Sequence, residues 1–295
     1  MKTNDPLSLD EERWPALDAA RLNGALASGA GPWREVRVVE QTGSTNADLL
    51  AEARAGTGDG LVLVAEAQTA GRGRLGRRWV SPPRGTLTFS VLLRPAGVPA
   101  GLLGWLPLLA GVATASALAK TAGVDARLKW PNDVLAGGAK LAGILAERWG
   151  ESIVLGIGIN VFQRRDELPV PTATSVLLAA PEAAAAAADG AAGADMRERL
   201  LTAVLEELAR WYRAWLDQPR PGDAGGCGLR AEYLRRSDTV GAEVTVLLPG
   251  GQSLTGTATG VDPAGRLEVR TPAGPVQVSA GDVVHLRRAD TPAAR

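Results

Sequence analysis

The stretch "GRGRLGRRW", residues 71 to 79, places four arginines and three glycines in nine positions. It follows the apolar run "LVLVAEAQ", residues 61 to 68, which predicts a buried strand. Glycines allow a ligand to approach the backbone closely, and guanidinium groups match carboxylate or phosphate oxygens with paired hydrogen bonds. Since α/β sheets present ligands at the carboxyl ends of their strands, an anion-binding loop is the favoured interpretation. A solvated basic turn and an RNA-contacting segment are the alternatives.

The charge balance of the whole chain restricts its partners. Lys plus Arg and Asp plus Glu number 32 each, so the formal net charge is zero. No overall field attracts nucleic acid or an acidic membrane, and any anion must be bound locally. The single cysteine, Cys227, cannot form an internal disulfide, and the N-terminal residues lack the apolar core of a signal peptide. We therefore expect a cytoplasmic protein with no nucleic-acid or membrane partner.

One segment without charges, the 25 residues from 95 to 119, is long enough to span a membrane. Pro99 and Pro107 interrupt it, and Ala, Gly, Ser and Thr fill much of the rest. The pattern favours a helix from about Leu106 that is buried on all sides in an α/β core.

The remaining patterns predict three parts. Residues 1 to 34 form an N-terminal extension, and we expect deletion of residues 1 to 30 to leave activity intact. Residues 35 to 235 form the main domain, and residues 240 to 290 form a small β-barrel of short strands separated by Gly-Gly, Asp-Pro and Ala-Gly turns.

Within the main domain, residues 35 to 40 predict a strand and residues 44 to 56 a helix capped by a hydroxyl residue. The alternating "GTLTFSVLLR", residues 85 to 94, predicts a half-buried strand. Three later strands form a meander, over residues 126 to 130, 139 to 149 and 151 to 162. The alanine-rich residues 180 to 195 favour a surface loop, and a helix follows over residues 196 to 216.

Three further motifs carry polar groups at strand ends. "LKWPNDV", residues 128 to 134, places Asn132 and Asp133 at a turn, where they can bond a heterocycle. "KLAGILAE", residues 140 to 147, begins with Lys140 and contains Gly143, which suggests close approach of another group. "GIGIN", residues 156 to 160, repeats that device and ends in Asn160. Each motif by itself is equally compatible with an ordinary turn or a solvated strand end.

Several kinds of site are excluded by composition. The only histidine is His285, and no Cys/His cluster is present, so a zinc site or a histidine-based triad is not expected. No glycine is followed by Lys and Ser/Thr in the frame of a Walker motif. Phosphates must be bound in another way, and we assign no metal ligands.

The order of these motifs, from the Ser-Thr-Asn helix start through "GRGRLGRRW", "KWPND", "KLAGI" and "GIGIN", resembles the bacterial biotin protein ligases. "EYLRRSDTVGAEVTV" resembles that family's junction to its C-terminal domain. The resemblance implies an α+β fold: a class II synthetase-like catalytic domain with a mixed, largely antiparallel sheet, followed by an SH3-like barrel.

The resemblance also implies a reaction. Biotin and ATP give biotinyl-5′-AMP and pyrophosphate, and a lysine of a biotin carboxyl carrier domain then attacks the mixed anhydride. Magnesium would accompany the triphosphate. The carrier domain of biotin-dependent carboxylases is the expected partner, and the protein itself is expected to be a monomer or a weak homodimer.

Residue by residue, the matched motifs imply two groups of contacts and three catalytic cations, Arg72, Arg74 and Lys140. The biotin site would comprise Ser44, Thr45, Asn46, Gln68, Gly71, Arg72, Gly73, Arg74, Lys140 and Gly143, with the backbone near Gly143 meeting the ureido ring. The ATP and adenylate site would comprise Arg74, Arg77, Trp79, Asn132, Lys140 and Asn160, with Trp79 packed on the adenine.

Two departures from the family pattern stand out. Leu75 lies where many relatives carry another basic residue. An N-terminal DNA-binding domain, present in some relatives, is not expected, because residues 1 to 34 fall short of the roughly 50 residues that a domain needs.

Two alternatives stay open. A lipoate-type ligase shares the fold and the acyl-adenylate chemistry but not this arginine loop or the C-terminal barrel. An RNA-binding module would need aromatic stacking platforms, and the chain has only two tyrosines and two phenylalanines.

Overall fold

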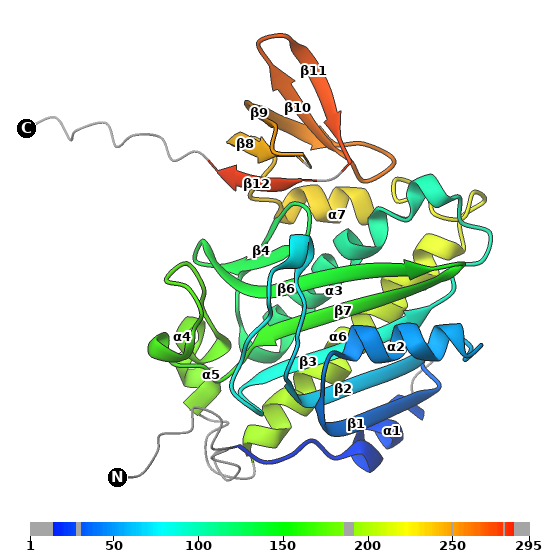
Figure 1. Ribbon diagram of the computed structural model, residues 1–295, viewed down its shortest axis with the longest axis vertical. Coiled ribbons are helices and arrows are strands. Elements are labelled where there is room, and N and C mark those ends of the chain that lie inside the picture. The colour runs from blue at the N-terminus through cyan, green and yellow to red at the C-terminus, as the bar shows by residue number, and fades with distance from the viewer. Residues whose placement is uncertain (1–13, 28–30, 186–191, 249, 280, 286–295) are drawn as a thin grey trace, which may run out of the picture.

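A seven-stranded mixed sheet forms the centre of the computed structural model, which describes residues 14–27, 31–185, 192–248, 250–279 and 281–285 (Figure 1). The strand order is β1-β2-β3-β7-β6-β5-β4. Only β1 and β2 are parallel, and every other neighbouring pair is antiparallel. The strands are β1 Glu35–Thr42, β2 Leu61–Gln68, β3 Thr86–Leu93, β4 Ala126–Lys129, β5 Asp133–Ala136, β6 Ala139–Trp149 and β7 Ser152–Asn160.

Helices cover the two faces of this sheet unequally. Helix α2, Thr45–Arg54, packs a small apolar cluster against one face, whereas α3, Trp105–Ala122, and α6, Ala192–Leu216, cover the other face and enclose the main core. Because helices lie on both faces, all eight residues of β3 are buried. The prediction of a half-buried strand there was wrong. Alternation of side chains shows which face of a strand is more apolar, but it does not show that the other face is exposed.

The uncharged segment forms a buried helix, as predicted. Thirteen residues of α3 are buried, and Pro107 lies in its first turn, where a missing backbone N–H is tolerated. By length and composition Ala100–Ala122 could cross a membrane, and it is the only such helix in the described part of the chain. However, 72% of its most apolar window lies buried inside the protein.

The meander contains one strand more than predicted. The short strand β5 lies between β4 and β6, directly after the Pro-Asn-Asp turn.

The alanine-rich region also differs from the predicted loop, because Pro181–Ala185 forms helix α5 and α6 already begins at Ala192. Residues 186 to 191 lie outside the described residues. Helical propensity of alanine prevails there over the missing amphipathic pattern. Helix α4 spans Val176–Ala179.

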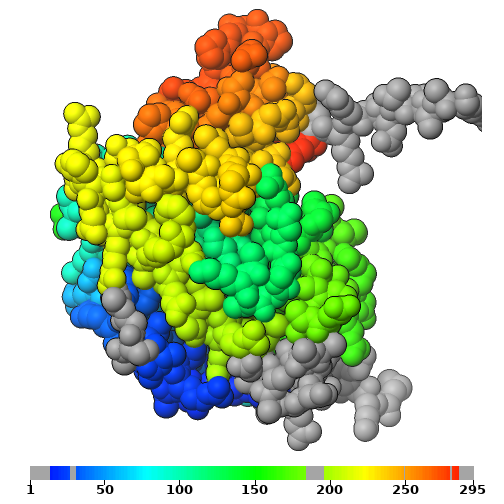
Figure 2. Space-filling model, turned by 180° about the vertical axis from the view of Figure 1, so that it is seen from behind, coloured from blue at the N-terminus to red at the C-terminus, as the bar shows by residue number. Residues whose placement is uncertain are grey.

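A second, antiparallel sheet follows helix α7, Leu229–Arg236, and has the strand order β11-β10-β9-β8-β12. Its five short strands agree with the short strands predicted within residues 240 to 290: β8 Glu243–Leu247, β9 Ser253–Val261, β10 Leu267–Thr271, β11 Gly274–Val278 and β12 Asp282–His285. The indole N–H groups of Trp105 and Trp130 donate to Pro263 O (2.8 Å) and Gly265 O (3.1 Å). These bonds fix the sheet directly on the main domain, where Figure 2 shows it in orange.

The described N-terminal residues pack on the main domain. Helix α1, Ala19–Ala27, buries Leu22, and the N–H of Leu17 donates to Glu66 Oε1 at 2.6 Å. Glu66 forms a fully buried ion pair with Arg197, whose guanidinium also donates to Pro15 O at 2.6 Å. The segment therefore covers a buried charge pair. This packing argues against the expectation that residues 1 to 30 are dispensable.

We predict that Leu22→Ala lowers the free energy of unfolding by about 2–5 kcal/mol, because a buried leucine leaves a cavity when it is truncated. The control is Arg21→Ala on the same helix: its side chain is 63% exposed and pairs with Glu198, so about 1 kcal/mol or less is expected. Urea denaturation measures both. Equal, small losses would mean that α1 contributes nothing to the core.

Candidate active site

A cavity of about 320 Å³ lies on the face of the sheet that carries α2, beyond the N-terminus of that helix. Gly156 and Gly158 of β7 and Gly143 of β6 leave its floor free of side chains. The cavity brings together twelve of the fourteen residues expected at the site: Ser44, Thr45, Asn46, Gln68, Arg72, Gly73, Arg74, Arg77, Trp79, Asn132, Lys140 and Gly143.

Hydroxyl and amide groups line one end of the cavity. The N–H of Thr45 donates to Gln68 Oε1 at 2.8 Å, and the hydroxyls of Thr45 and Ser90 lie 2.7 Å apart. Ser90 donates to Asn46 Oδ1 at 2.6 Å, and the Asn46 amide donates to Glu147 Oε2 at 2.8 Å. This network fixes the orientation of a buried amide at the start of α2.

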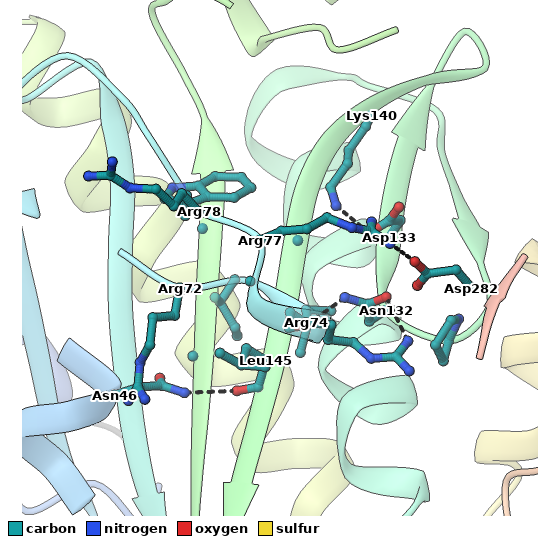
Figure 3. Close-up of a pocket in the computed structure, with 18 of the residues that line it drawn as sticks. Asn46, Arg72, Arg74, Arg77, Arg78, Asn132, Asp133, Lys140, Leu145 and Asp282 are labelled. Atoms are coloured by element: carbon teal, nitrogen blue, oxygen red, sulfur yellow. Dashed lines mark hydrogen bonds and ion pairs between the residues drawn. The ribbon is translucent and has the colours of Figure 1, made fainter. Parts of the chain in front are cut away.

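Ser44 and Asn46 both lie at the start of α2, where the cavity begins. Ser44 is the N-cap residue of α2, as predicted, but its side chain makes no capping hydrogen bond. The amide of Asn46 also donates to Leu145 O at 3.2 Å (Figure 3). A Cβ on Gly156 would lie 2.2 Å from Asn46 Oδ1, so only glycine leaves room for this amide.

The arginine loop crosses in front of the floor and is closed by its own backbone. The N–H of Gly73 donates to Arg77 O at 2.7 Å, and that of Trp79 donates to Gly71 O at 2.9 Å. Gly71 does not line the cavity; a Cβ there would lie 2.5 Å from Trp79 O, so this glycine shapes the loop. Leu75 has φ +55° and is 64% exposed at the tip.

Three cations of the site are each paired with a carboxylate, and Figure 3 shows the pairs of Lys140 and of Arg77. Lys140 Nζ donates to Asp133 Oδ1 at 2.5 Å. Arg77 pairs with Asp282, which lies on β12 of the C-terminal sheet. A third pair joins Arg72 and Glu147, with 3.3 Å between Nη2 and Oε2. Because ion pairs that remain open to water contribute little, an incoming anion can replace these partners.

Arg74 differs from these three cations. Its Nη1 lies 3.3 Å from the amide oxygen of Asn132, and burial lowers its pKa, although Asp133 raises it. A partly buried guanidinium whose only hydrogen bond among the described residues goes to an amide is a strong site for an anion, because Asp133 compensates only part of its desolvation.

Trp79 lies over the glycine floor. A Cβ on Gly158 would lie 2.6 Å from Cε2 of the indole, and one on Gly143 would lie 3.2 Å from Cζ3. The indole N–H is buried and has no hydrogen-bond partner among the described residues. The indole ring of Trp79 therefore lies beside Gly143, where the resemblance puts the ureido ring of biotin. It also lies near the space that the resemblance assigns to adenine.

Asn160 is the other expected residue that does not line the cavity. Its amide donates to Thr174 O at 2.9 Å, and its Oδ1 accepts from Gln163 at 3.0 Å, so it holds the segment that follows β7. Both bonds are buried. This placement gives Asn160 a supporting position beside the site.

Sequence reasoning missed two residues of the cavity, Lys129 and Asp282, and a carboxylate that pairs with Arg72, Glu147. Lys129 ends β4, and burial lowers its pKa most, with further lowering from Lys140 and Arg77 and an opposing effect of Asp133. Lys129 lies inside the motif "LKWPNDV", residues 128 to 134, so the sequence could have identified it as a site residue. Asp282 carried no signal, because nothing in its local sequence connects it to a loop about 200 residues earlier.

Comparison with known proteins agrees with this geometry. Residues 38–162 match the Biotin/lipoate A/B protein ligase family, and residues 239–286 match the Biotin protein ligase C terminal domain. The Mycobacterium tuberculosis protein named Biotin–[acetyl-CoA-carboxylase] ligase is 45% identical over 281 residues, which cover 92% of this chain and 97% of that protein. A Paracoccus denitrificans protein of the same name is 34% identical and covers 83% and 98%.

Solved structures show the same similarity. The biotin protein ligase from Aquifex aeolicus in complex with biotin and ATP is 28% identical, with a TM-score of 0.69 over 87% of this chain and all of that one. A mutant form of the Aquifex aeolicus protein in complex with biotin gives a TM-score of 0.70 over 86% of this chain and 99% of that one.

We predict that Gly156→Ala weakens binding of biotin about tenfold or more, because the added Cβ displaces the Asn46 amide and breaks its network. Isothermal titration with biotin measures the effect. Gly101→Ala is the control, since a Cβ there meets open space. Unchanged affinity in Gly156→Ala would remove Asn46 from the binding site.

Proposed function

This chain belongs to the biotin/lipoate protein ligase family, and we propose that it activates biotin as biotinyl-5′-AMP and transfers it to a lysine of a biotin carboxyl carrier domain. One observation carries the proposal: a single cavity joins a hydroxyl and amide end to a set of fixed cations. Relatives named for ligation of biotin to acetyl-CoA carboxylase, and a similar structure holding biotin and ATP, support the same activity.

Biotin suits the uncharged end of the cavity. Its ring system is apolar apart from a urea, which needs both donors and acceptors. Thr45, Ser90 and Asn46 supply these groups beside the glycine floor. The carboxylate of the ligand would then extend toward Arg72. In the free protein the guanidinium of Arg72 and the amide of Asn46 both contact the carboxylate of Glu147.

In the first step two anions must meet. A carboxylate oxygen of biotin attacks the α-phosphorus of ATP, the bond from that phosphorus to the bridging oxygen breaks, and pyrophosphate leaves. Fixed cations lower the barrier, because they stabilise the charge that develops on the α-phosphate. We assign this role to Arg72, Arg74 and Lys140. In the second step a lysine amine attacks the carbonyl carbon, loses a proton, and AMP leaves.

Magnesium would enter with ATP. The part of the chain that the structure describes contains no cluster of three His, Cys, Asp or Glu side chains able to hold a metal ion. Magnesium commonly keeps several waters and binds through substrate phosphates. We infer that the triphosphate, rather than a protein cage, supplies most of its ligands, and no step above depends on it.

The decisive test of the class is mass spectrometry of a biotin carboxyl carrier domain after incubation with this protein, ATP, Mg²⁺ and biotin. We expect the mass to rise by one biotinyl group, and lipoate in place of biotin to give no modification. Modification by lipoate alone would assign the chain to the lipoate branch of the family. No modification by either acid would refute the proposal.

We predict that Lys140→Ala keeps the fold and loses most adenylate formation. Lys140 is half-buried at the start of β6, so it contributes little to stability, whereas a cation at the α-phosphate acts mainly in the transition state. Biotin-dependent pyrophosphate release measures the effect, and Lys120→Ala on α3, with a side chain 64% exposed, is the control. Equal release by Lys140→Ala and wild type would exclude Lys140 from the mechanism.

We predict that the arginine loop is cleaved by trypsin in the free protein and protected when the adenylate is bound. Ordering nine residues costs about 1–2 kcal/mol each in backbone entropy, and this polar loop buries little of itself. Charge-assisted hydrogen bonds to an anion return roughly 1.5–3 kcal/mol each. Biotin alone, with one carboxylate, should protect the loop less. Equal cleavage after Arg77 in all three states would show that the loop does not close on ligand.

A further inference from the structure

Lys140 reaches the cavity through an irregularity in its own strand. Two successive residues of β5 pair with Ala142 and with Lys140 of β6, so the register passes over Leu141 and β6 bulges there. Lys140 and Gly143 are three positions apart, and in a regular strand their side chains would emerge on opposite faces. A Cβ on Gly143, however, would lie 3.3 Å from Lys140 Nζ, so both residues face the cavity. The bulge turns the lysine toward the site.

A separate segment, residues 172 to 175, pairs with the backbone of Lys140. The N–H of Lys140 donates to Thr172 O at 2.8 Å, and the N–H of Thr174 donates to Lys140 O, also at 2.8 Å. Because β5 borders β6 on one side, this segment lies on the side of β7, which pairs with β6 only from Ala142 onward. Residues 172 to 175 therefore take the place of β7 beside Lys140 and fix its backbone at the bulge.

Two side chains outside the cavity hold this segment in place. Ser175 is fully buried, and its hydroxyl donates to Gln163 O at 2.7 Å. Arg165 approaches from the surface, and its Nη1 donates to Ala173 O at 2.7 Å. These bonds join residues 172 to 175 to the chain that follows β7, so the position of the segment does not depend on Lys140 alone.

The proposed activation step needs a lysine that is already in position. A cation lowers the barrier when it stands where charge develops, because moving it during the reaction would cost free energy. Lysine carries its ammonium on a flexible four-carbon stem, so the backbone is the part that the fold can fix. Lys140 Nζ also bonds Asp133 Oδ1 at 2.5 Å, and this contact depends in turn on the register of β5 and β6.

We propose that residues 172 to 175 position Lys140 for the activation step, and that Ser175 and Arg165 are its positioning residues. This role rests on the proposed function. Both side chains lie outside the cavity, so they act through the backbone of Lys140 and not on a substrate. Loosening the segment would let Lys140 move away from the α-phosphate. The biotin end of the cavity, where Ser90 of β3 bonds Asn46, would stay as it is.

Kinetics of the first half-reaction test this role. Ser175→Ala and Arg165→Ala should each lower kcat for biotin-dependent pyrophosphate release about three- to tenfold, as expected for loss of one hydrogen bond. The dissociation constant of biotin, measured by isothermal titration, should change less than about twofold. Two matched controls lie at the ends of β7 and β6 that are remote from Lys140. They are Ser152→Ala and Arg148→Ala, and Arg148 donates to Gly150 O at 2.7 Å. Both should keep the wild-type kcat.

Amide hydrogen exchange tests the link to Lys140 without any measurement of activity. In both variants the amide of Lys140 should exchange at least about threefold faster than in wild type, because its bond to Thr172 opens more often. The amide of Leu155, in the middle of β7, should exchange at the wild-type rate. In a Lys140→Ala background the two substitutions should lower the residual kcat less than about twofold, since their effect passes through the lysine.

A wild-type kcat in Ser175→Ala and Arg165→Ala, or an unchanged exchange rate of the Lys140 amide, would refute the positioning role. So would a loss of kcat in the Lys140→Ala background as large as in wild type, or a weakening of biotin binding in parallel with kcat. A wild-type protein that binds biotin but releases no pyrophosphate would instead refute the proposed function.

Discussion

The concentration of positive charge in one cavity of a chain without net charge is the constraint on which the site depends. Cations that are gathered from a loop and two strands repel one another and lose hydration. Glu147, Asp133 and Asp282 pair with three of them in the free protein. These carboxylates hold the cations near the positions where substrate anions need them. Each partner is exchangeable, because the pairs lie at an open cavity and not in the core.

This constraint also explains why the chain needs both sheets. Asp282 belongs to β12, and its pairing with Arg77 joins the C-terminal sheet to the arginine loop. Tryptophan bonds fix that sheet beside β4, so the pairing has a defined geometry. A loop with few contacts of its own thus gains an anchor on a rigid element. Closure of the loop and the position of the C-terminal sheet are consequently coupled in the proposed mechanism.

Much of this arrangement could be predicted from sequence, because it depends on local patterns. The strands before the arginine loop and all five C-terminal strands follow from alternation and turn residues. Lys140 and Asn132 meet the loop because the ends of neighbouring strands share one edge of a sheet. Gly143 in β6 and the two glycines in β7 correctly indicated close approach, of Trp79 and of Asn46.

The rest depends on contacts between distant segments. The pairing of Arg77 with Asp282 and that of Glu66 with Arg197 join residues that no local pattern relates. Strand β5 was missed because its first residue, Asp133, was counted with the Pro-Asn-Asp turn, and the Gly137-Gly138 turn follows its last residue directly. Asn160 shows a further limit: its position in the motif was clear, but its side chain turns away to bond Thr174. The direction in which a side chain points at the end of a strand is set by tertiary packing.

In the proposed function, biotin and the α-phosphate of ATP are joined in this cavity, and the product is held there. The most direct measurement uses ATP labelled at its α-phosphate, mixed with biotin and stoichiometric protein in the absence of a carrier domain, followed by rapid desalting. We expect the label to elute with the protein in a one-to-one ratio as biotinyl-5′-AMP, and only when biotin is present. Label that fails to remain with the protein, or that is retained equally without biotin, would contradict it.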